Sequence, residues 1–340
     1  MKNKFILLLL LLTVSYNSFS ISKEDKEKEN SYLTKIKNEN DSDAMFDLGL
    51  LYHDQERYDL AEKYYLMAIK DNNSSAMNNL GLIYENQKKY DLAEKYYLMA
   101  AEQEMDTSIY NLGLLYEKQK KYALAEKYYL MAVKNNYNDA IFNLAYLYDN
   151  QEKFGLAEKY YLMSVKDNDS NAMYNLALIY ENQKKYPLAE KYYLMAIDHN
   201  DSDAVFNLAF LYDEQNKYNL AEKYYLMAVK DNNATAMYNL GLLYDNQKKY
   251  PLAEKYYLMA VKNNSISAMF NLGLLYDIQE KYDLAEKYYL MGVKHDDSDS
   301  MYNLASLYYN QEKYSAAKKY FLMAEKFGNK EATKALKENF

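Results

Sequence analysis

Asparagine is the residue whose type and spacing offer the clearest chemistry, because it recurs with one fixed period along most of the chain. A carboxamide both donates and accepts hydrogen bonds, so a row of them can pair with the backbone of an extended peptide whatever its side chains. The alternative is that asparagine is merely common at this position and contacts only water. The row consists of Asn79, Asn111, Asn143, Asn175, Asn207, Asn239, Asn271 and Asn303.

Two chemically different columns accompany the asparagines with the same period. An aromatic residue precedes most of them, and an acidic residue follows most of them at the sixth position. The aromatic residues are Tyr110, Phe142, Tyr174, Phe206, Tyr238 and Phe270, and the central acids are Asp149, Glu181, Asp213 and Asp245. A further column between them is mostly leucine, with Tyr146 and Phe210 as aromatic members. These columns predict a ligand that is an extended or unfolded segment with alternating apolar and basic residues.

The sequence contains no recognisable catalytic or cofactor motif. Its three histidines, His53, His199 and His295, have no metal-ligand spacing, and there is no cysteine, HExxH motif, GxSxG motif or glycine-rich phosphate loop. The many carboxylates stand mostly at fixed positions beside lysine, as in Glu62-Lys63, which is typical of a solvated helical face. We therefore predict neither an enzyme nor a metal or cofactor site, and an enzyme such as a cell-wall hydrolase is the remote third alternative.

The segments that must position these columns repeat as strictly as the columns do. The sequence AEKYYLMA occupies residues 61–68 and returns unchanged at 93–100, 125–132, 189–196, 221–228 and 253–260. Altered copies stand at 157–164, 285–292 and 317–324. A fixed period of this kind indicates a repeat architecture. With only 8 Gly and 2 Pro in the chain, the sequence predicts one elongated all-α array rather than two globular domains.

Each repeat, such as residues 42–73, contains two amphipathic stretches with helical spacing. Met45, Leu48, Gly49 and Tyr52 mark the first (helix A), and Tyr58, Ala61, Tyr65, Ala68 and Ile69 mark the second (helix B), with Leu60, Tyr64 and Met67 extending its apolar face. Both prolines, Pro187 and Pro251, predict the start of helix B, since proline is tolerated in a first helical turn. The Ala61 and Gly49 positions hold only small residues, which predicts close packing of the two helices.

The first position of each repeat is predicted to cap helix A. Seven of the nine residues there are Ser, Asp or Asn, whose side-chain oxygens accept from free backbone N–H groups. Ala234 and Ile266 are the exceptions, and each has a hydroxyl residue next to it.

The pattern Met45-x-x-Leu48-Gly49-x-x-Tyr52, followed by Tyr58, Ala61, Tyr65 and Ala68, resembles the tetratricopeptide repeat. The connection from Ala100 to Gly113 is similar to that of the Sel1-like repeat. The resemblance covers residues 42 to about 329 and implies an α-solenoid of stacked helix–turn–helix repeats, with helices A lining a concave surface. It also implies that the asparagines form a ladder like the one by which some such proteins hold an extended peptide.

The ends of the chain are predicted to differ from the repeats. Residues 1–20 have a basic start, an apolar run from Phe5 to Val14, and small residues at Ser18 and Ser20, which predicts a secretory signal peptide cleaved after Ser20. An uncleaved anchor is the alternative. Residues 21–41 are predicted as a charged lead-in and N-terminal capping helix, residues 42–329 as nine repeats, and residues 330–340 as a C-terminal capping helix. The protein is therefore expected in the periplasm or outside a bacterial cell.

Charge restricts the partners that the exported chain is expected to bind. The net charge of the full sequence is −8, and loss of Lys2 and Lys4 with the signal would leave −10. This disfavours nucleic acids and anionic membranes, so we expect a protein or peptide partner, and membrane contact only through an uncleaved signal. The second hypothesis is a self-associating envelope array that uses an outward leucine column of helix B. Its members are Leu66, Leu98, Leu130, Leu162, Leu194, Leu226, Leu258, Leu290 and Leu322.

Overall fold

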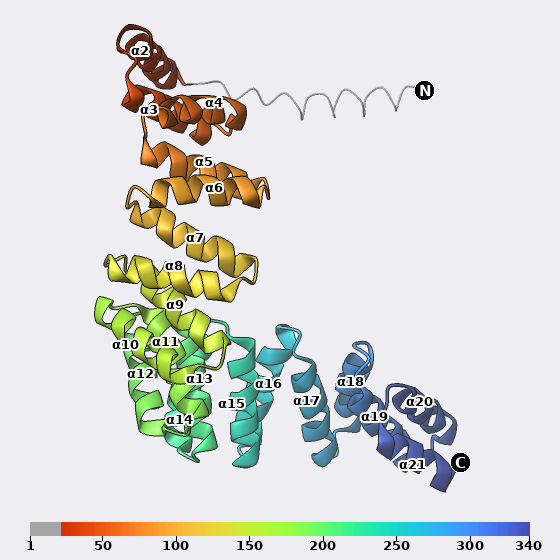
Figure 1. The fold of residues 1–340 in the computed structure, drawn as a ribbon. Coiled ribbons are helices and arrows are strands. Elements are labelled where there is room, and N and C mark those ends of the chain that lie inside the picture. The colour runs from red at the N-terminus through yellow and green to blue at the C-terminus, as the bar shows by residue number, and fades with distance from the viewer. Residues whose placement is uncertain (1–21) are drawn as a thin grey trace, which may run out of the picture. The chain divides into compact units, whose positions relative to one another are not determined.

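The computed structural model describes residues 22–340, so the predicted signal segment lies outside the described residues. Within residues 22–340 the regular elements are twenty α-helices and one short 3₁₀ helix, with no β-strand (Figure 1). The predicted all-α fold of helix–turn–helix repeats is therefore confirmed.

The helices follow one another at nearly constant length, which reflects the sequence period. In chain order they are α2 (Lys23–Glu39), α3 (Ser42–Asp54), α4 (Tyr58–Ile69), α5 (Ser74–Asn86), α6 (Tyr90–Ala101), α7 (Asp106–Lys118), α8 (Tyr122–Lys134), α9 (Asp139–Asn150), α10 (Phe154–Ser164), η1 (Val165–Asp167), α11 (Ser170–Asn182), α12 (Tyr186–Asp198), α13 (Ser202–Glu214), α14 (Tyr218–Lys230), α15 (Ala234–Asn246), α16 (Tyr250–Lys262), α17 (Ile266–Ile278), α18 (Tyr282–Val293), α19 (Ser298–Asn310), α20 (Tyr314–Lys326) and α21 (Lys330–Asn339).

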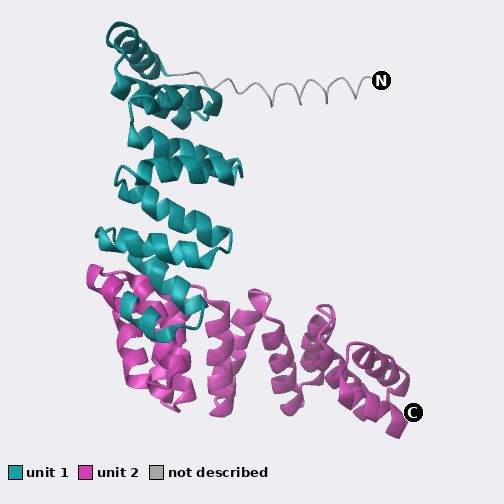
Figure 2. Cartoon of the chain, viewed as in Figure 1, with its two compact units in different colours: residues 1–160 teal, residues 161–340 magenta. Residues whose placement is uncertain are grey.

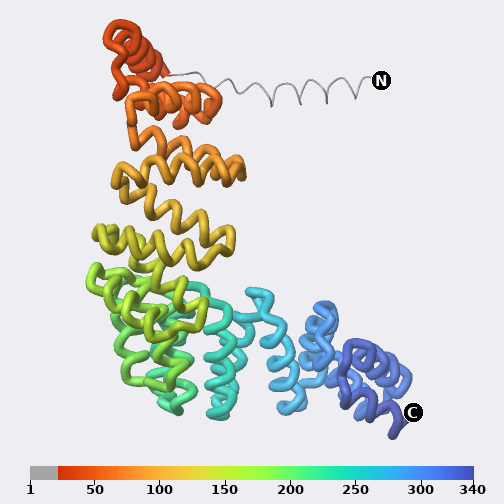
Figure 3. Tube along the Cα trace, in the orientation of Figure 1, coloured from red at the N-terminus to blue at the C-terminus, as the bar shows by residue number. Residues whose placement is uncertain are grey.

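Odd-numbered helices from α3 to α19 are helices A, and even-numbered helices from α4 to α20 are helices B. The chain forms two compact units, residues 1–160 (unit 1) and residues 161–340 (unit 2), coloured separately in Figure 2. Within each unit consecutive helices pack against each other, as α5 does with α6 and α6 with α7, so that helical hairpins stack in sequence order (Figure 3). Pro187 and Pro251 lie in the first turns of α12 and α16, as predicted.

The small residues of helix A are required by a buried tyrosine of helix B. A Cβ atom added to Gly81 would lie 2.6 Å from Cδ1 of Tyr97, whose side chain is completely buried. The same relation holds for Gly241 and Tyr257. The alanine that opens each AEKYYLMA segment, such as Ala93, is also completely buried. Both small-residue columns therefore allow the two helices of a hairpin to pack closely, as predicted.

A tyrosine–glutamate hydrogen bond joins successive hairpins, and it corrects the prediction that the Glu62 position is merely solvated. The Tyr84 hydroxyl donates to Glu62 Oε1 of the preceding helix B at 2.8 Å, and Tyr276 donates to Glu254 at 2.7 Å. The ring of the helix-A tyrosine stacks on the first tyrosine of the YY pair in its own helix B, so its hydroxyl reaches the neighbouring repeat. In α2, Glu29 supplies the same acceptor to Tyr52 at 2.6 Å.

The predicted capping position of helix A is wrong by one residue. The N-caps are mostly the loop residues before Ser42 and its equivalents, and their side chains accept from backbone N–H groups of the first turn. Asn233 and Ser265 therefore cap the helices that begin with Ala234 and Ile266. The capping residue must have an extended backbone for its side chain to reach these donors, and the predicted residues are already helical. Only Asn138 stands at both the predicted and the observed position, and its side chain makes no capping bond.

The first turn of helix B is more exposed than its helical pattern predicts. Tyr58 is 40% exposed and Leu92 is 39% exposed, although the pattern places both positions on the packed face.

Candidate functional site

The eight predicted asparagines are all half-buried on helices A, one on each odd-numbered helix from α5 to α19. Each stands between two buried residues of its helix, as Asn207 stands between Val205 and Leu208. Packing of those neighbours holds the asparagine backbone in place, and its side chain lies at the edge of the core. We call the surface formed by the asparagine, aromatic, leucine and acidic columns the helix-A face.

Several asparagines are held by a hydrogen bond to the preceding repeat. The amide nitrogen of Asn143 donates to the hydroxyl of Tyr110 at 2.6 Å in unit 1. In unit 2, Asn207 donates to Tyr174 at 2.7 Å, and Asn271 donates to Tyr238 at 3.0 Å. Each such bond uses one amide N–H, so the side-chain carbonyl and the second N–H can still pair with a ligand. The sequence does contain a signal for these bonds, because each tyrosine precedes its asparagine by one repeat plus one residue.

The aromatic column alternates between tyrosine and phenylalanine from Tyr110 onward, so the bond can form only in every second repeat. In unit 2, Asn239 and Asn303 follow Phe206 and Phe270, which have no hydroxyl. Asn303 instead donates to the backbone carbonyl of Asp299 in its own helix. Column-by-column inspection of the sequence treats these asparagines as equivalent, whereas the structure places them in two different environments.

The first interruption of the aromatic column is a small polar cluster in unit 1. Buried Asn78 replaces the aromatic residue, and its side-chain oxygen accepts from the Ser108 hydroxyl and from the Asn111 amide, each at 2.9 Å. Asn78 also donates to Asn79 at 3.3 Å, and Asn79 donates to the Tyr65 hydroxyl at 3.4 Å. Asn111 is therefore oriented by the carboxamide of Asn78, and Asn79 by that carboxamide together with the Tyr65 hydroxyl of helix B.

The acidic column is anchored by the buried tyrosine of helix B, a contact that sequence inspection missed. Glu117 accepts from Tyr129 at 2.6 Å, Asp245 accepts from Tyr257 at 3.2 Å, and Glu181 accepts from Tyr193. These carboxyl groups, like that of Asp149, are half-buried. The acids bonded in this way are therefore partly exposed and also fixed in place.

One tyrosine links the aromatic and acidic columns within each of several repeats. In α14, the ring of Tyr225 lies 6.1 Å from the ring of Phe206, and its hydroxyl donates to Asp213 at 3.4 Å. Burial raises the pKa of Asp213, while the bond from Tyr225 opposes that shift and nearby Glu214 adds to it. Burial likewise raises the pKa of Glu181. The site therefore holds carboxylates next to aromatic rings in a partly desolvated setting.

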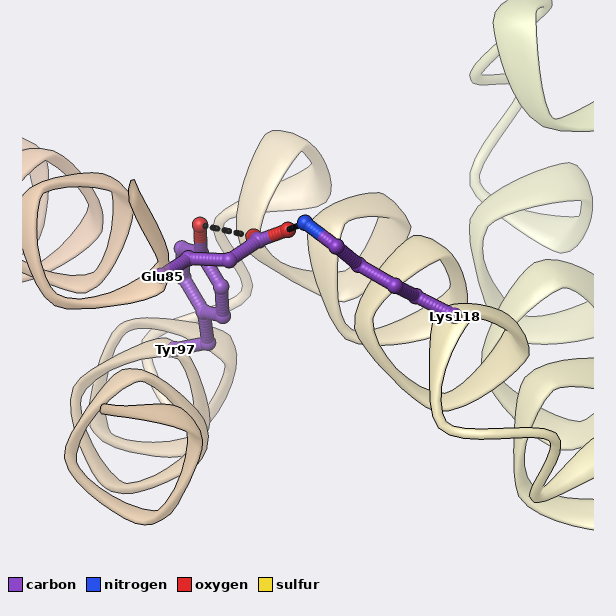
Figure 4. Close-up of polar contacts among 3 residues, drawn as sticks. All are labelled: Glu85, Tyr97 and Lys118. Carbon is purple, nitrogen blue, oxygen red and sulfur yellow. Dashed lines mark hydrogen bonds and ion pairs between the residues drawn. The ribbon is translucent and has the colours of Figure 1, made fainter. Parts of the chain in front are cut away.

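One acid of unit 1 is paired with a basic side chain of the protein itself. The Lys118 ammonium lies 3.2 Å from Glu85 Oε1, while Tyr97 donates to the other oxygen of that carboxylate at 3.0 Å (Figure 4). Lys118 is the last residue of α7, at a position that is asparagine in most repeats. The sequence predictions did not include this position.

Neither a metal cluster nor a membrane-spanning helix is found in the described part of the chain. Residues 22–340 contain no group of three or more His, Asp or Glu side chains arranged to hold a metal ion. No helix among the same residues is both long and apolar enough to cross a bilayer.

Comparison with known families identifies matches along most of the chain. Models described as tetratricopeptide repeat match residues 36–76, 46–106, 142–204 and 206–265 in one form. Two further forms match residues 107–139 and 266–292, and residues 298–324. No curated protein is similar enough in sequence to count as a match.

Solved structures similar to this chain share little sequence with it. One is c5321, a protective antigen present in uropathogenic Escherichia coli strains that displays an SLR fold. It is 20% identical with a TM-score of 0.62, and the alignment covers 92% of this chain and 79% of that one. A Sel1 repeat protein from Oxalobacter formigenes is 23% identical with a TM-score of 0.45, over 64% of this chain and 96% of that one. The first comparison supports the solenoid fold, and at this identity it supports the fold alone.

Proposed function

The chain belongs to the tetratricopeptide repeat family, and we propose that it is an exported scaffold that binds an extended peptide segment on its helix-A face. The fold of this family is typically a non-enzymatic scaffold, and such repeats generally bind protein or peptide partners. Because a fold alone does not specify a ligand, the finer proposal depends on the side chains of the face itself.

The oriented asparagines are the observation that carries the proposal. The bond from Asn207 to Tyr174 holds the carboxamide before any ligand arrives, so less side-chain entropy is lost on binding. The remaining carbonyl and N–H of that amide match the donor and acceptor of a peptide unit. Asn271 repeats the arrangement two hairpins later in unit 2, and Asn111 and Asn143 provide it in unit 1.

The neighbouring columns define which side chains the peptide would carry. Half-buried aromatic and leucine side chains provide apolar contact, and the anchored carboxylates attract lysine or arginine. Successive helices A approach each other within a unit, as α11 and α13 do, so one peptide can reach several repeats. Weak contacts at each repeat then add up along the bound segment.

Peptide arrays test the proposal directly. The mature chain is expected to bind peptides with alternating apolar and basic residues and to ignore peptides in which acidic residues replace the basic ones. Changing Asn207 and Asn271 to Ala should weaken binding, because it removes two oriented amides. The matched control is Asn219→Ala on α14, an exposed position at which another repeat has Ala123. Equal binding by the double variant and the control would refute the role of the asparagines.

The variant Tyr174→Phe tests whether peptide binding requires the Asn207 amide to be oriented, and not only to be present. Phenylalanine already occupies this position in alternate repeats, so the variant is expected to fold. It leaves Asn207 in place without its hydroxyl partner and should weaken peptide binding less than Asn207→Ala does. Equal binding by Tyr174→Phe and the parent would show that the bond is not needed to position the amide.

Export is the second part of the proposal and has its own test. The signal at residues 1–20 predicts that the mature protein begins at Ile21. Mass spectrometry of the protein from an envelope or culture fraction should identify that N-terminus. Recovery of the intact Met1 terminus from the cytoplasm would contradict export.

Self-association through helix B is the alternative function, and the exposure of its leucines favours testing it. Leu130 is 37% exposed and Leu322 is 48% exposed, while the Lys127 ammonium lies over the ring of Tyr128. Light scattering should compare the parent with a variant in which Leu162, Leu194, Leu226 and Leu258 are changed to Gln. An associating parent and a monomeric variant would support this alternative. Equal masses would leave the helix-A face as the better candidate.

A further inference from the structure

The most exposed aromatic pair on the helix-A face of unit 2 lies on α13. The rings of Phe206 and Phe210 stack with their centroids 6.5 Å apart, and Phe210 is 41% exposed. The repeats before and after have the half-buried leucines Leu178 and Leu242 in place of Phe210. The second phenylalanine therefore adds apolar surface that packing of the repeats does not cover, and partly exposed aromatic side chains commonly anchor ligands.

The charges beside this pair differ from those at the equivalent place in unit 1. Glu214 ends α13 and follows Glu181 by one repeat plus one residue, just as Lys118 ends α7 and follows Glu85 by the same interval. In unit 1 the lysine neutralises the acid of the preceding repeat at 3.2 Å (Figure 4). In unit 2 a third carboxylate occupies the place of that lysine.

In unit 2, the Glu214 carboxylate is close enough to those of Glu181 and Asp213 to repel both. Glu214 contributes to the raised pKa of both Glu181 and Asp213, after the larger effect of burial. Among residues 22–340, none of the ion pairs involves Glu181, Asp213 or Glu214. A cation in unit 2, at the place equivalent to that of the Lys118 ammonium in unit 1, would relieve this repulsion.

We propose that Phe206, Phe210, Glu181, Asp213 and Glu214 form the main anchor for the bound peptide, which we call the α13 surface. The occupant is a lysine or arginine side chain of an extended peptide, together with the apolar residue beside it. Charge complementarity selects this occupant, since three carboxylates border an exposed aromatic pair with no basic partner. The flat guanidinium of arginine can also stack on an aromatic ring. This inference depends on the proposed peptide-binding function and specifies its strongest contact.

The two units should consequently differ in what they accept. At the equivalent place in unit 1, Lys118 satisfies Glu85 and would repel a basic side chain. The α13 surface has the opposite charge, so basic peptides should bind unit 2 in preference. Glu214→Lys therefore tests the inference with a residue type that the chain already has at the equivalent position of unit 1.

The probe is a fluorescein-labelled peptide in which every second residue is serine and the residues between are alternately leucine and lysine. The comparison peptide has norleucine in place of each lysine. Fluorescence anisotropy with the mature chain should show weaker binding of the lysine peptide to Glu214→Lys by about tenfold, because an attractive charge becomes a repulsive one. Glu214→Asn, which copies Asn182 and Asn246 of the adjacent repeats, should have a smaller effect in the same direction. Lys118→Asn in unit 1 is the matched control and should not weaken binding of the lysine peptide, because it removes a charge that repels basic side chains.

The aromatic part of the α13 surface is tested by Phe210→Leu, which copies the adjacent repeats. It should weaken both peptides a few-fold, without changing the preference for lysine over norleucine. An unchanged affinity for both peptides would remove Phe210 from the anchor. Circular dichroism of each variant should match the parent, because each new residue already occurs at the equivalent position of this chain.

The outcomes separate this inference from the function on which it depends. If the parent binds neither peptide, the proposed function fails. If the parent binds lysine and norleucine peptides equally, or Glu214→Lys binds the lysine peptide as well as the parent, peptide binding stands and the α13 anchor is refuted. If Glu214→Lys instead converts an oligomer into a monomer by light scattering, the occupant is a second copy of the chain and the inference is overturned.

Discussion

The side chain of Ser300 occupies the space that a methyl group on Gly292 would need. A Cβ atom added to Gly292 would lie 2.7 Å from Ser300 Cβ and closer still to its hydroxyl oxygen. Most other repeats have alanine at both positions, as in Ala260 and Ala268, and both of those residues are completely buried. The two substitutions therefore compensate for each other, since serine replaces alanine on α19 where glycine replaces alanine on α18.

Gly292→Ala alone should destabilise unit 2 by about 1–3 kcal/mol, because it overpacks this contact. The Ser300 hydroxyl is buried with no hydrogen-bond partner in the described chain, so Ser300→Ala should be neutral or stabilising. The double variant restores the alanine pair and should be at least as stable as the parent. Urea denaturation of the four proteins measures this coupling, and strictly additive effects would contradict the contact.

Ala189→Leu should cost about 1–3 kcal/mol by overpacking the middle of the array. Ala189 is completely buried on α12 and stands in the position that is alanine in every repeat. Leu188→Ala next to it is a suitable control, because Leu188 is 39% exposed and its loss should cost less. An Ala189→Leu protein that melts at the parent temperature would show that this contact tolerates bulk.

Lys184→Gly should stabilise the chain by about 0.5–1 kcal/mol. Lys184 lies in the turn between α11 and α12 with a φ of 58°, a left-handed conformation that favours glycine over lysine. Asn200→Gly is the matched control, since Asn200 has a similar φ of 65° and asparagine tolerates it. Thermal melts should therefore separate the two variants. A lower melting temperature for Lys184→Gly than for Asn200→Gly would contradict the assigned strain.

Binding of basic peptides should weaken as the pH falls toward the raised pKa values of Glu181 and Asp213. Burial is the main cause of both shifts, so these carboxyls take up protons at a less acidic pH than exposed ones do. Their folded pKa exceeds the unfolded one, so their contribution to the free energy of unfolding rises as the pH falls. Protonation of these two groups therefore does not unfold the protein, so weaker binding in acid would not result from unfolding that they cause.

The pH dependence can be assigned with isosteric variants. Glu181→Gln and Asp213→Asn keep an oxygen that can accept from Tyr193 and Tyr225 but remove the titrating charges. Anisotropy measured between pH 7 and about pH 5 should vary less for this double variant than for the parent. Equal pH profiles would assign the titration to other groups.

The repeat period and the small residues were sufficient to predict the hairpins. Columns such as Gly81 and Ala93 report directly on close contacts, because any larger side chain there meets a neighbouring helix. The N-cap was misplaced by one residue because Ser42 and Asp41 both have capping side chains, and only backbone conformation distinguishes them.

The contacts between columns could not be predicted in the same way. The Asn207–Tyr174 and Tyr84–Glu62 bonds join different repeats, and each depends on how one hairpin is rotated against the next. Inspection of single columns compares equivalent positions and does not compare one column with another, so it misses both kinds of pair. The charge reversal between Lys118 and Glu214 was missed for a different reason, since both residues depart from the asparagine that occupies this position in most repeats.

The central claim is that side-chain amides of the helix-A face bind the backbone of a peptide. The most direct measurement is isothermal titration of the mature chain with the leucine–lysine peptide and with the same peptide methylated at alternate backbone nitrogens. Methylation removes backbone donors and leaves every side chain in place. We predict that it weakens binding by about tenfold or more, because the half-buried carboxamide oxygens of the asparagines then lose their hydrogen-bond partners. Equal affinities of the two peptides would contradict the account.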